Sequence, residues 1–440
     1  MENSVVHKPE NLQGSRKLEA SKGKQEIQKN ILLISPNFSP EPTGIGKVNG
    51  EMMNWLAKQG CNCSVLTAFP YYPQWKIQPP YTNGWFKKEV LIIPDTDKTI
   101  TVYRCPFYIP ARPSGAKRML QDFSYWFSMS LVAAKFILAG KKYDLVITIA
   151  PPFHLGYLGL MISKRTGGKL FYHIQDLQIE AAEELRMVPG KKLLNYFYRM
   201  EKKLLQKADF VGGISPNMVK KTKAKVDRDV IYFPNWVDTD FFHPLENRNQ
   251  LKEKWGFQPW DIVFLYSGAI GEKQGLENIL FTAGDLSAKT NIKFVICGSG
   301  PYTEKLTRLS EKMRLTNISF LPVQDKDVFN EFLNMADYHL ILQKGNASDL
   351  VMPSKLATIL AVGGLSIVTT SPGTSLYNLY TENDIGYIVE PDNHVFLSKL
   401  ISDLGTDGNN EQKRKNAREY AVNHLNIDNV MSEFIGKVLI

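Results

Sequence analysis

Three glycine-marked segments follow one another in the second half of the chain, and each is of a kind that binds phosphate. Residues 266–275 are Tyr-Ser-Gly-Ala-Ile-Gly-Glu-Lys-Gln-Gly, residues 297–301 are Cys-Gly-Ser-Gly-Pro, and Pro-Ser-Lys at 353–355 precedes a Gly-Gly pair. The first two follow apolar runs typical of buried strands and precede helical patterns. Glycine lets the backbone approach an anion, and the N–H groups and dipole of a helix start favour negative charge. Together with the lysine of the third segment, they predict a ligand that carries a diphosphate.

Alternating strands and helices must position these segments, and the alternation occurs twice. Apolar strand patterns run from Asn30 to Tyr232, and a second series runs from Ile262 to Val389. This alternation predicts an α/β fold of two doubly wound, Rossmann-like domains that face each other across a cleft, with ligands at the strands' carboxyl ends. We expect a disordered tail at 1–29, a first domain at 30–233, a second domain at 234–410, and a C-terminal helix at 411–440 that packs back toward the first domain.

Length and composition agree with two domains. The 440 residues are too many for one ordinary core, and contents of 43% apolar and 22% charged residues indicate a folded globular protein. The four cysteines have no spacing typical of zinc or of a disulfide framework, which favours a reducing cytoplasm. Three Asp-x-Asp triplets, at 95–97, 238–240 and 325–327, fall in a loop, at the crossover between domains and at a helix start, so we predict no metal site.

The charge distribution suggests a membrane surface as one partner. Residues 1–240 contain 34 Lys and Arg against 21 Asp and Glu, a net of +13, whereas the rest has a net of −4. No nucleic-acid module is recognised, so we predict no nucleic-acid partner. An anionic membrane face or a lipid diphosphate fits the basic half, and a solvated basic surface is the alternative. Residues 1–29 lack a signal peptide's apolar core, and 123–139 is too interrupted for a transmembrane helix.

The order of these motifs resembles that of glycosyltransferase family 4, whose members have the GT-B two-domain architecture, over residues 30–435. The family motifs matched are Gly44-Ile45-Gly46, Pro234-Asn235, Gly268 to Gly275, Gly298-Ser299-Gly300-Pro301 and Pro353-Ser354-Lys355. Further segments resemble the branch typified by the colanic acid biosynthesis glycosyltransferases, namely Phe69 to Lys76, Tyr103 to Pro106, Pro113 to Arg118 and His173 to Asp176.

The resemblance implies a retaining glycosyltransferase that moves a sugar from a nucleotide-diphosphate donor to a lipid-linked exopolysaccharide intermediate. The expected donor is GDP-fucose or a similar GDP-sugar, a co-substrate used without a metal or other cofactor. Such an enzyme would be cytoplasmic, peripherally associated with the inner face of the plasma membrane. Two alternatives stay open: a sugar-nucleotide 2-epimerase of the same architecture, and a non-catalytic sugar-nucleotide-binding subunit.

For the donor site, the resemblance implies contacts mainly from the second domain. Lys355, with Ser354 beside it, is the expected cation at the diphosphate or nucleotide. Many relatives have a basic residue directly before the last glycine of 266–275, where this chain has Gln274, with Lys273 one step earlier. The other predicted donor-binding residues are Gly44, Gly268, Gly298, Gly300 and Pro301.

The ribose contact departs from the family pattern. Many relatives carry a Glu-x7-Glu pair, and here its two positions fall on Leu350 and Thr358. The carboxylate of the neighbouring Asp349 could replace part of this contact, and the Thr358 hydroxyl could supply a weaker hydrogen bond.

The predicted catalytic residues belong to the first domain. Gly46 should bring its backbone N–H against the donor diphosphate when the domains close. The family often has a histidine that touches the donor sugar. The end of the strand favours His173 for this position, whereas the following Asp-Leu favours Gln175. We predict His173 and Asp176 as catalytic residues, and a purely structural histidine is the alternative.

The acceptor side combines aromatic and basic residues. Tyr72 and Trp75 lie in an aromatic, proline-rich insertion at 69–86, which could stack on acceptor sugars or build a hydrophobic mini-core. A basic loop and an aromatic helix that follow are what a membrane-interface helix requires, and a helix packed in the core is the alternative. The residues concerned are Arg112, Lys117, Arg118 and Trp126.

Overall fold

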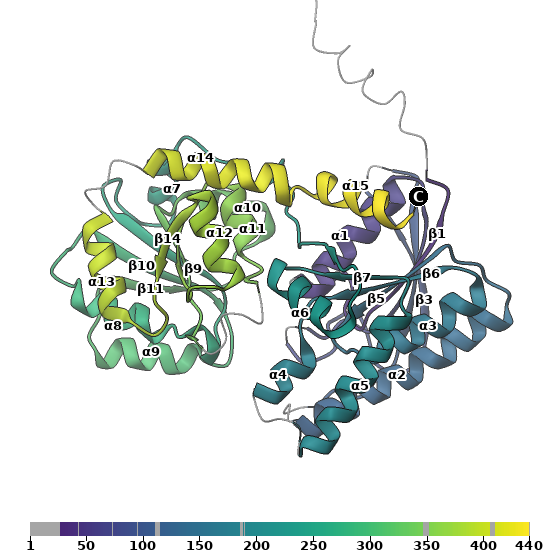
Figure 1. Ribbon diagram of the computed structural model, residues 1–440. Helices are drawn as coiled ribbons and strands as arrows, with labels where there is room; N and C mark the ends of the chain where they lie inside the picture. Colours follow the sequence, from purple (N-terminus) through teal and green to yellow (C-terminus); the bar gives the residue numbers. More distant parts are fainter. Residues whose placement is uncertain are drawn as a thin grey trace, which may run out of the picture.

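The computed structural model describes residues 27–439 except 43, 73, 95, 111–114, 185–187, 189, 346–351 and 405–409. Within these residues the chain forms two α/β domains side by side, and its last helix lies on the first domain (Figure 1). Residues 1–26, nearly all of the predicted disordered tail, lie outside the described residues.

The described strands of the first domain form one sheet in the order β3-β4-β2-β1-β5-β6-β7-β8, parallel except for β3. Its centre is apolar on both faces, as in β5, because helices cover both sides. The strands are β1 (Asn30–Ile34), β2 (Asn62–Ala68), β3 (Lys87–Ile92), β4 (Thr99–Cys105), β5 (Leu145–Ala150), β6 (Lys169–Ile174), β7 (Phe210–Gly213) and β8 (Ile231–Tyr232). The helices are α1 (Gly44–Lys58), α2 (Gly115–Leu138), α3 (Leu155–Thr166), α4 (Gln178–Glu184), α5 (Lys191–Lys207) and α6 (Pro216–Val226).

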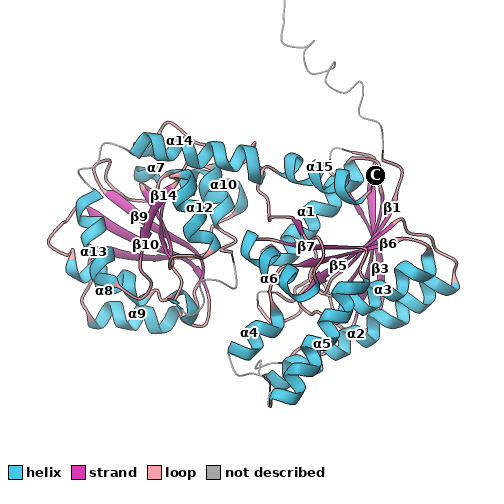
Figure 2. Cartoon of the chain, in the orientation of Figure 1, coloured by secondary structure: helices cyan, strands magenta, loops and turns pink. Residues whose placement is uncertain are grey.

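The described strands of the second domain form a parallel sheet in the order β11-β10-β9-β12-β13-β14. Helices lie around this sheet (Figure 2). The strands are β9 (Ile262–Ala269), β10 (Ile292–Ser299), β11 (Ile318–Leu321), β12 (Tyr338–Ile341), β13 (Leu365–Thr369) and β14 (Gly386–Val389). The helices are α7 (Arg248–Lys254), η1 (Glu272–Gln274), α8 (Glu277–Asp285), α9 (Thr303–Lys312), α10 (Lys326–Asn334), α11 (Leu356–Ala361), α12 (Ser375–Asn383), α13 (His394–Asp403), α14 (Asn410–Tyr420) and η4 (Ala421–Leu425). The last helix of the chain, α15 (Ile427–Val438), follows η4.

Two crossings of the chain join the domains, and they are bonded to each other. Val237 donates its N–H to the Leu425 carbonyl at 2.8 Å and accepts from the Ile427 N–H at 3.3 Å. After this crossing, α15 buries Met431 and Phe434 in the same core cluster as α1. The first domain therefore has α1 and α15 on one face of its sheet and α2, α3 and α5 on the other.

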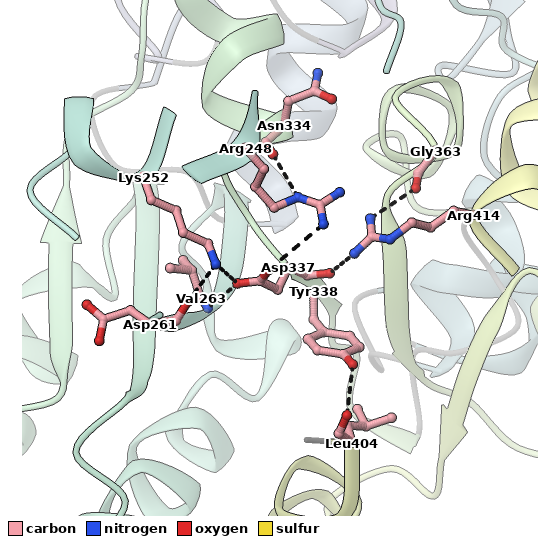
Figure 3. Close-up of polar contacts among 10 residues, drawn as sticks. All are labelled: Arg248, Lys252, Asp261, Val263, Asn334, Asp337, Tyr338, Gly363, Leu404 and Arg414. Atoms are coloured by element: carbon pink, nitrogen blue, oxygen red, sulfur yellow. Dashed lines mark hydrogen bonds and ion pairs between the residues drawn. The ribbon is translucent and has the colours of Figure 1, made fainter. Parts of the chain in front are cut away.

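An ionic network holds α14 to the second domain, near the amino end of β12 (Figure 3). The Asp337 carboxylate accepts from the Val263 N–H at 2.8 Å and pairs with Lys252 Nζ at 2.8 Å, while its backbone carbonyl accepts from Arg414 at 2.8 Å. A buried charge is tolerated when it is paired and hydrogen-bonded in this way. The network lies away from the carboxyl ends of the strands, so it leaves that edge free for a ligand.

The predicted α/β fold of two Rossmann-like domains is confirmed, and three local details differ from expectation. Strand β3, an exposed strand at the edge of the sheet, was not expected from the sequence. The glycine segment at 44–46, which its composition indicates as part of a loop after the first strand, is the first turn of α1. Lys117 and Arg118, predicted in a basic loop, lie in the first turn of α2.

Candidate active site

Lys355 lies where the second domain's strands end, and its ammonium is buried. Its Nζ lies 3.4 Å from the centre of the Tyr266 ring, and a Cβ on Gly268 would lie 3.1 Å from the same atom. Among the described residues this Nζ has no hydrogen-bond partner. Burial lowers the pKa of Lys355 well below its ordinary value, because the charged form has lost its water. Such an ammonium is only partly compensated by the aromatic ring, so it is a ready partner for an anion.

The predicted donor glycines hold two loops together. Gly298 has φ +150°, and a Cβ there would overlap the carbonyl oxygen of Gly268 on the neighbouring strand. A Cβ on Gly300 would overlap the Ile270 carbonyl oxygen, and Ile270 donates its N–H to Ser299 at 2.9 Å. The ends of β9 and β10 are therefore packed backbone to backbone, which only glycine permits.

The basic side of this edge includes one residue that the sequence analysis missed. Gln274 does not point outward, because its Oε1 accepts the Gly271 N–H at 3.1 Å and closes the loop. Lys273 is exposed, and its carbonyl accepts the Lys344 N–H at 3.0 Å. Lys344 follows β12 and packs near Gly275; its place after a buried strand was the only signal in the sequence.

The structure gives few contacts for the other predicted donor-binding residues. Pro301 and Ser354 are exposed. The Thr358 hydroxyl donates to the Lys355 carbonyl at 2.9 Å, so a ribose could only use its oxygen as an acceptor. Asp349 and the acceptor-side residue Arg112 lie outside the described residues.

On the first domain, the turn with Gly44 and Gly46 packs on a buried carboxylate. A Cβ on Gly46 would lie 2.5 Å from Glu41 Oε2, and a Cβ on Gly44 would lie 3.5 Å from the Tyr72 ring. Glu41 is 2% exposed and accepts the N–H groups of Tyr71 and Tyr72 at 3.0 Å each. The sequence analysis missed Glu41, whose only signal was its place between two prolines after the first strand.

His173, one of the predicted catalytic residues, lies buried among aromatic rings at the end of β6. Its ring is 2% exposed and packs against Phe171 and Phe233 at centroid distances of 5.6 and 5.0 Å. Burial lowers the pKa of His173 to about 3, so the imidazole is neutral. The side chain of Gln175 lies between His173 and Asn235. Its Nε2 is 2.9 Å from His173 Nε2, and its amide exchanges two hydrogen bonds of 3.0 Å with the amide of Asn235. This burial is what the alternative of a structural histidine leads us to expect, and a catalytic role for His173 stays a prediction.

Asp176 is the predicted catalytic residue that lies nearer the other domain. Burial raises the pKa of its carboxyl to about 6, and the charge of Lys273, from the second domain, acts in the opposite direction. The domains also touch directly, since the Asn217 N–H donates to the Ser375 hydroxyl at 3.0 Å. Met352, just before the Pro-Ser-Lys segment, packs against cores of both domains.

The aromatic insertion contains a hydrophobic mini-core, one of the two uses that the sequence left open. Tyr71 is buried and meets Trp75 and Phe107 edge-on, at 5.8 and 5.0 Å between ring centroids. Tyr72 and Trp75 are half-buried, and the Arg118 guanidinium lies 5.1 Å from the Trp75 ring centre. The insertion thus contains a mini-core, with Tyr72 and Trp75 at its accessible margin.

Helix α2 is amphipathic, with an unusual exposed apolar face. Tyr125, Met129, Ala133 and Phe136 are buried, whereas Met119, Phe123, Phe127 and Leu131, four residues apart, are exposed. Trp126 is half-buried and stacks on Phe123 at 6.3 Å, and Lys117 is exposed. No helix within the described residues is long and apolar enough to cross a membrane.

One further acid lies on the inner face of α2. Asp122 accepts the Tyr125 hydroxyl at 2.9 Å, and burial raises the pKa of its carboxyl to about 6. Gln178 Nε2 reaches its other oxygen at 3.5 Å. A single acid among apolar helix residues gave no sequence signal of a site. Among the described residues, no group of three or more His, Cys, Asp or Glu side chains could hold a metal ion.

Comparison with known proteins gives matches over both domains. Residues 43–236 match the family model "Glycosyl transferase 4-like domain", and residues 247–424 match "Glycosyl transferases group 1". The chain is 35% identical over 419 residues to WcaI of Escherichia coli, which is named as a glycosyl transferase of colanic acid biosynthesis, covering 93% of this chain and 99% of that protein.

Solved structures of low identity have the same fold. Sucrose-phosphate synthase from Thermosynechococcus elongatus has a TM-score of 0.71 at 14% identity, over 92% of this chain and 97% of that one. Anabaena HepE, solved with UDP and glucose, has a TM-score of 0.66 at 12% identity, over 94% of this chain and 100% of that one.

Proposed function

This chain belongs to the glycosyltransferases, of the group 1 and family 4 type with GT-B architecture, and we propose that it is a retaining enzyme of exopolysaccharide biosynthesis. It transfers a sugar from a nucleotide-diphosphate donor to a lipid-linked saccharide. The identity to WcaI, whose name refers to colanic acid, supports the polysaccharide pathway. The retaining outcome and a GDP-sugar donor, GDP-fucose first, follow from the resemblance to that branch.

The unpartnered ammonium of Lys355 is the observation that carries the donor site. It lies between the ends of the second domain's strands, beside Gly268, with Lys344 and Lys273 on the same edge. A departing nucleotide diphosphate gains negative charge, which a preorganised cation and backbone N–H groups stabilise in a dry site. We assign this role to Lys355 and the glycine loops, so that no metal is needed. HepE, which has the same fold, was solved with UDP and glucose, which supports a sugar nucleotide as the ligand.

The donor is identified by thermal denaturation in the presence of GDP-, UDP- and ADP-sugars. A ligand that binds only the folded protein raises the melting temperature, by about 2.7 kcal/mol of stabilisation at 100 times its Kd. We expect a GDP-sugar to give the largest shift and the free sugars to give none. If no sugar nucleotide raises the melting temperature, the proposed function is wrong. With a donor that does bind, release of nucleoside diphosphate only when a lipid-linked saccharide is added would establish transfer. Donor binding without turnover would favour a non-catalytic role.

We also propose that the exposed face of α2 docks on an anionic membrane. Its apolar residues occur every four positions, with Lys117 and Arg118 at the start of the helix. An interfacial helix needs such an apolar face to enter the acyl boundary and basic residues to attract anionic headgroups. The acceptor's lipid would then be presented beside Trp75 and Arg118, at the margin of the aromatic insertion.

Membrane docking is tested by the double variant Phe123→Glu and Phe127→Glu. We expect binding to vesicles of phosphatidylethanolamine and phosphatidylglycerol to fall about 100-fold or more, because burying each of the two phenylalanines contributes about 1.5–3 kcal/mol. The matched control is Val395→Glu with Phe396→Glu, a pair equally exposed on α13 of the second domain. Equal loss of sedimentation with vesicles in both double variants would show that α2 has no special part in docking.

A further inference from the structure

We infer that Glu41 is a positioning residue that holds the α1 glycine turn and the aromatic insertion in one arrangement and so sets acceptor binding. This inference rests on the proposed function for its substrate. Its structural part concerns contacts that are independent of any ligand.

The Glu41 carboxylate joins segments about 30 residues apart in the chain. Oε1 accepts the N–H groups of Tyr71 and Tyr72, both at 3.0 Å, and Oε2 accepts from the side-chain amide of Asn37 at 2.9 Å. No other hydrogen bond of those two N–H groups is present among the described residues. The Glu41 carboxylate therefore holds the start of the aromatic insertion in place.

A second set of contacts joins the loop before α1, which contains Glu41, to β3 and β4 at the edge of the sheet. Arg104 donates to the Ser39 carbonyl at 2.7 Å and to Glu89 at 2.5 Å, and its guanidinium lies 4.6 Å from the Tyr81 ring centre. Arg104 is 1% exposed and its charge opposes the effect of burial, which raises the pKa of Glu41. The loop before α1, β4 and the insertion are thus joined through two buried charged side chains.

The first turn of α1 packs directly against Glu41 and Tyr72. Gly46 leaves no room for a side chain against Glu41, and Tyr72 covers Gly44. A movement of Glu41 would therefore displace both the turn that should face the donor and the aromatic margin that should face the acceptor. Among the described residues, the hydrogen bonds of the Glu41 carboxylate are with Asn37, Tyr71 and Tyr72 of the first domain. The α1 turn should meet the donor only when the domains close, so loss of Glu41 should weaken acceptor binding more than donor binding.

The test compares Glu41→Gln and Glu41→Ala with Glu201→Gln. Glu201, on α5, is another buried carboxylate of the first domain. It pairs with Lys225 of α6 at 2.6 Å and not with the insertion. Glutamine can keep one oxygen on the two peptide N–H groups if the Asn37 amide rotates, whereas alanine accepts nothing. We expect amide exchange at Tyr71 and Tyr72 to quicken at least tenfold in Glu41→Ala, to be largely restored in Glu41→Gln, and to be unchanged in Glu201→Gln.

The functional readout uses a polyprenyl diphosphate-linked glucose as acceptor probe and the sugar nucleotide found by thermal denaturation. We expect Glu41→Ala to raise the acceptor KM at least tenfold, with Glu41→Gln between it and the wild type, and to raise the donor Kd by a smaller factor. Unchanged exchange at Tyr71 and Tyr72, or equal losses of donor and acceptor affinity, would overturn the inference. If the wild type binds no sugar nucleotide, the proposed function fails, and the exchange measurement alone decides the role of Glu41.

Discussion

Replacing Lys355 by methionine should weaken donor binding about 100-fold while making the ligand-free protein more stable. A hydrogen bond to a charged group contributes about 1.5–3 kcal/mol, which corresponds to a loss of roughly 10- to 100-fold in affinity when it is removed. The loss should approach the upper value because the Lys355 ammonium is desolvated before the donor arrives. Residues kept for binding at the expense of stability are expected at functional sites.

The gain in stability has a definite pH dependence. The pKa of Lys355 is lowered in the folded protein, so folding disfavours its charged form. This destabilisation is fully present below the folded-state pKa and disappears as the pH rises toward the ordinary pKa of lysine. Methionine keeps the packing on Tyr266 without a charge. The melting temperature of Lys355→Met should therefore exceed that of the wild type at neutral pH, and the difference should shrink at alkaline pH.

Isothermal titration with the donor and calorimetric melting without it measure the two effects separately. Lys312→Met, on an exposed position of α9 in the same domain, is the control and should change neither. A Lys355→Met protein that binds the donor normally would remove Lys355 from the site. A variant that loses both stability and binding would show that the lysine supports the fold.

The sequence predicted the two-domain fold because buried parallel strands leave apolar runs separated by helical patterns. It did not predict β3, whose residues alternate between exposed and half-buried at the sheet edge. Residues 44–46 end a stretch rich in proline and glycine that indicates a loop, yet they begin α1, where close packing on Glu41 requires glycine at position 46. Local patterns thus identified the elements, and tertiary contacts decided their ends.

Site residues were harder to predict because burial depends on segments remote in the sequence. His173 and Gln175 are two positions apart at a strand end, so spacing alone could not separate them. The ring of Phe171, which stacks on His173, is itself covered by Phe434 of α15, far along the chain. Lys355 could be identified from the Pro-Ser-Lys motif, but its missing hydrogen-bond partner is visible only in the folded protein.

The substitution Gly298→Ala should lower the free energy of unfolding by about 3 kcal/mol or more, since overpacking contributes about 1–3 kcal/mol and the positive φ about 1–2 kcal/mol. The added methyl group would overlap the Gly268 carbonyl oxygen, which cannot move aside as a flexible side chain can. Gly298 and Gly268 are partners in the register of β10 and β9. Relief of the overlap must therefore separate the strand ends and shift Gly268 away from Lys355.

Gly167→Ala separates backbone strain from overlap in this prediction. Gly167 also has a positive φ, of +83°, but no atom lies within 4 Å of the position its Cβ would take. Its replacement should therefore lower the free energy of unfolding by only about 1–2 kcal/mol and leave donor affinity unchanged. Denaturant unfolding compares the two variants, and titration with the donor sugar nucleotide shows whether Gly298→Ala also weakens binding. Equal destabilisation by both substitutions would mean that the β9 and β10 loops are not packed backbone to backbone, and the donor site would then lack the rigidity that its glycines are proposed to give it.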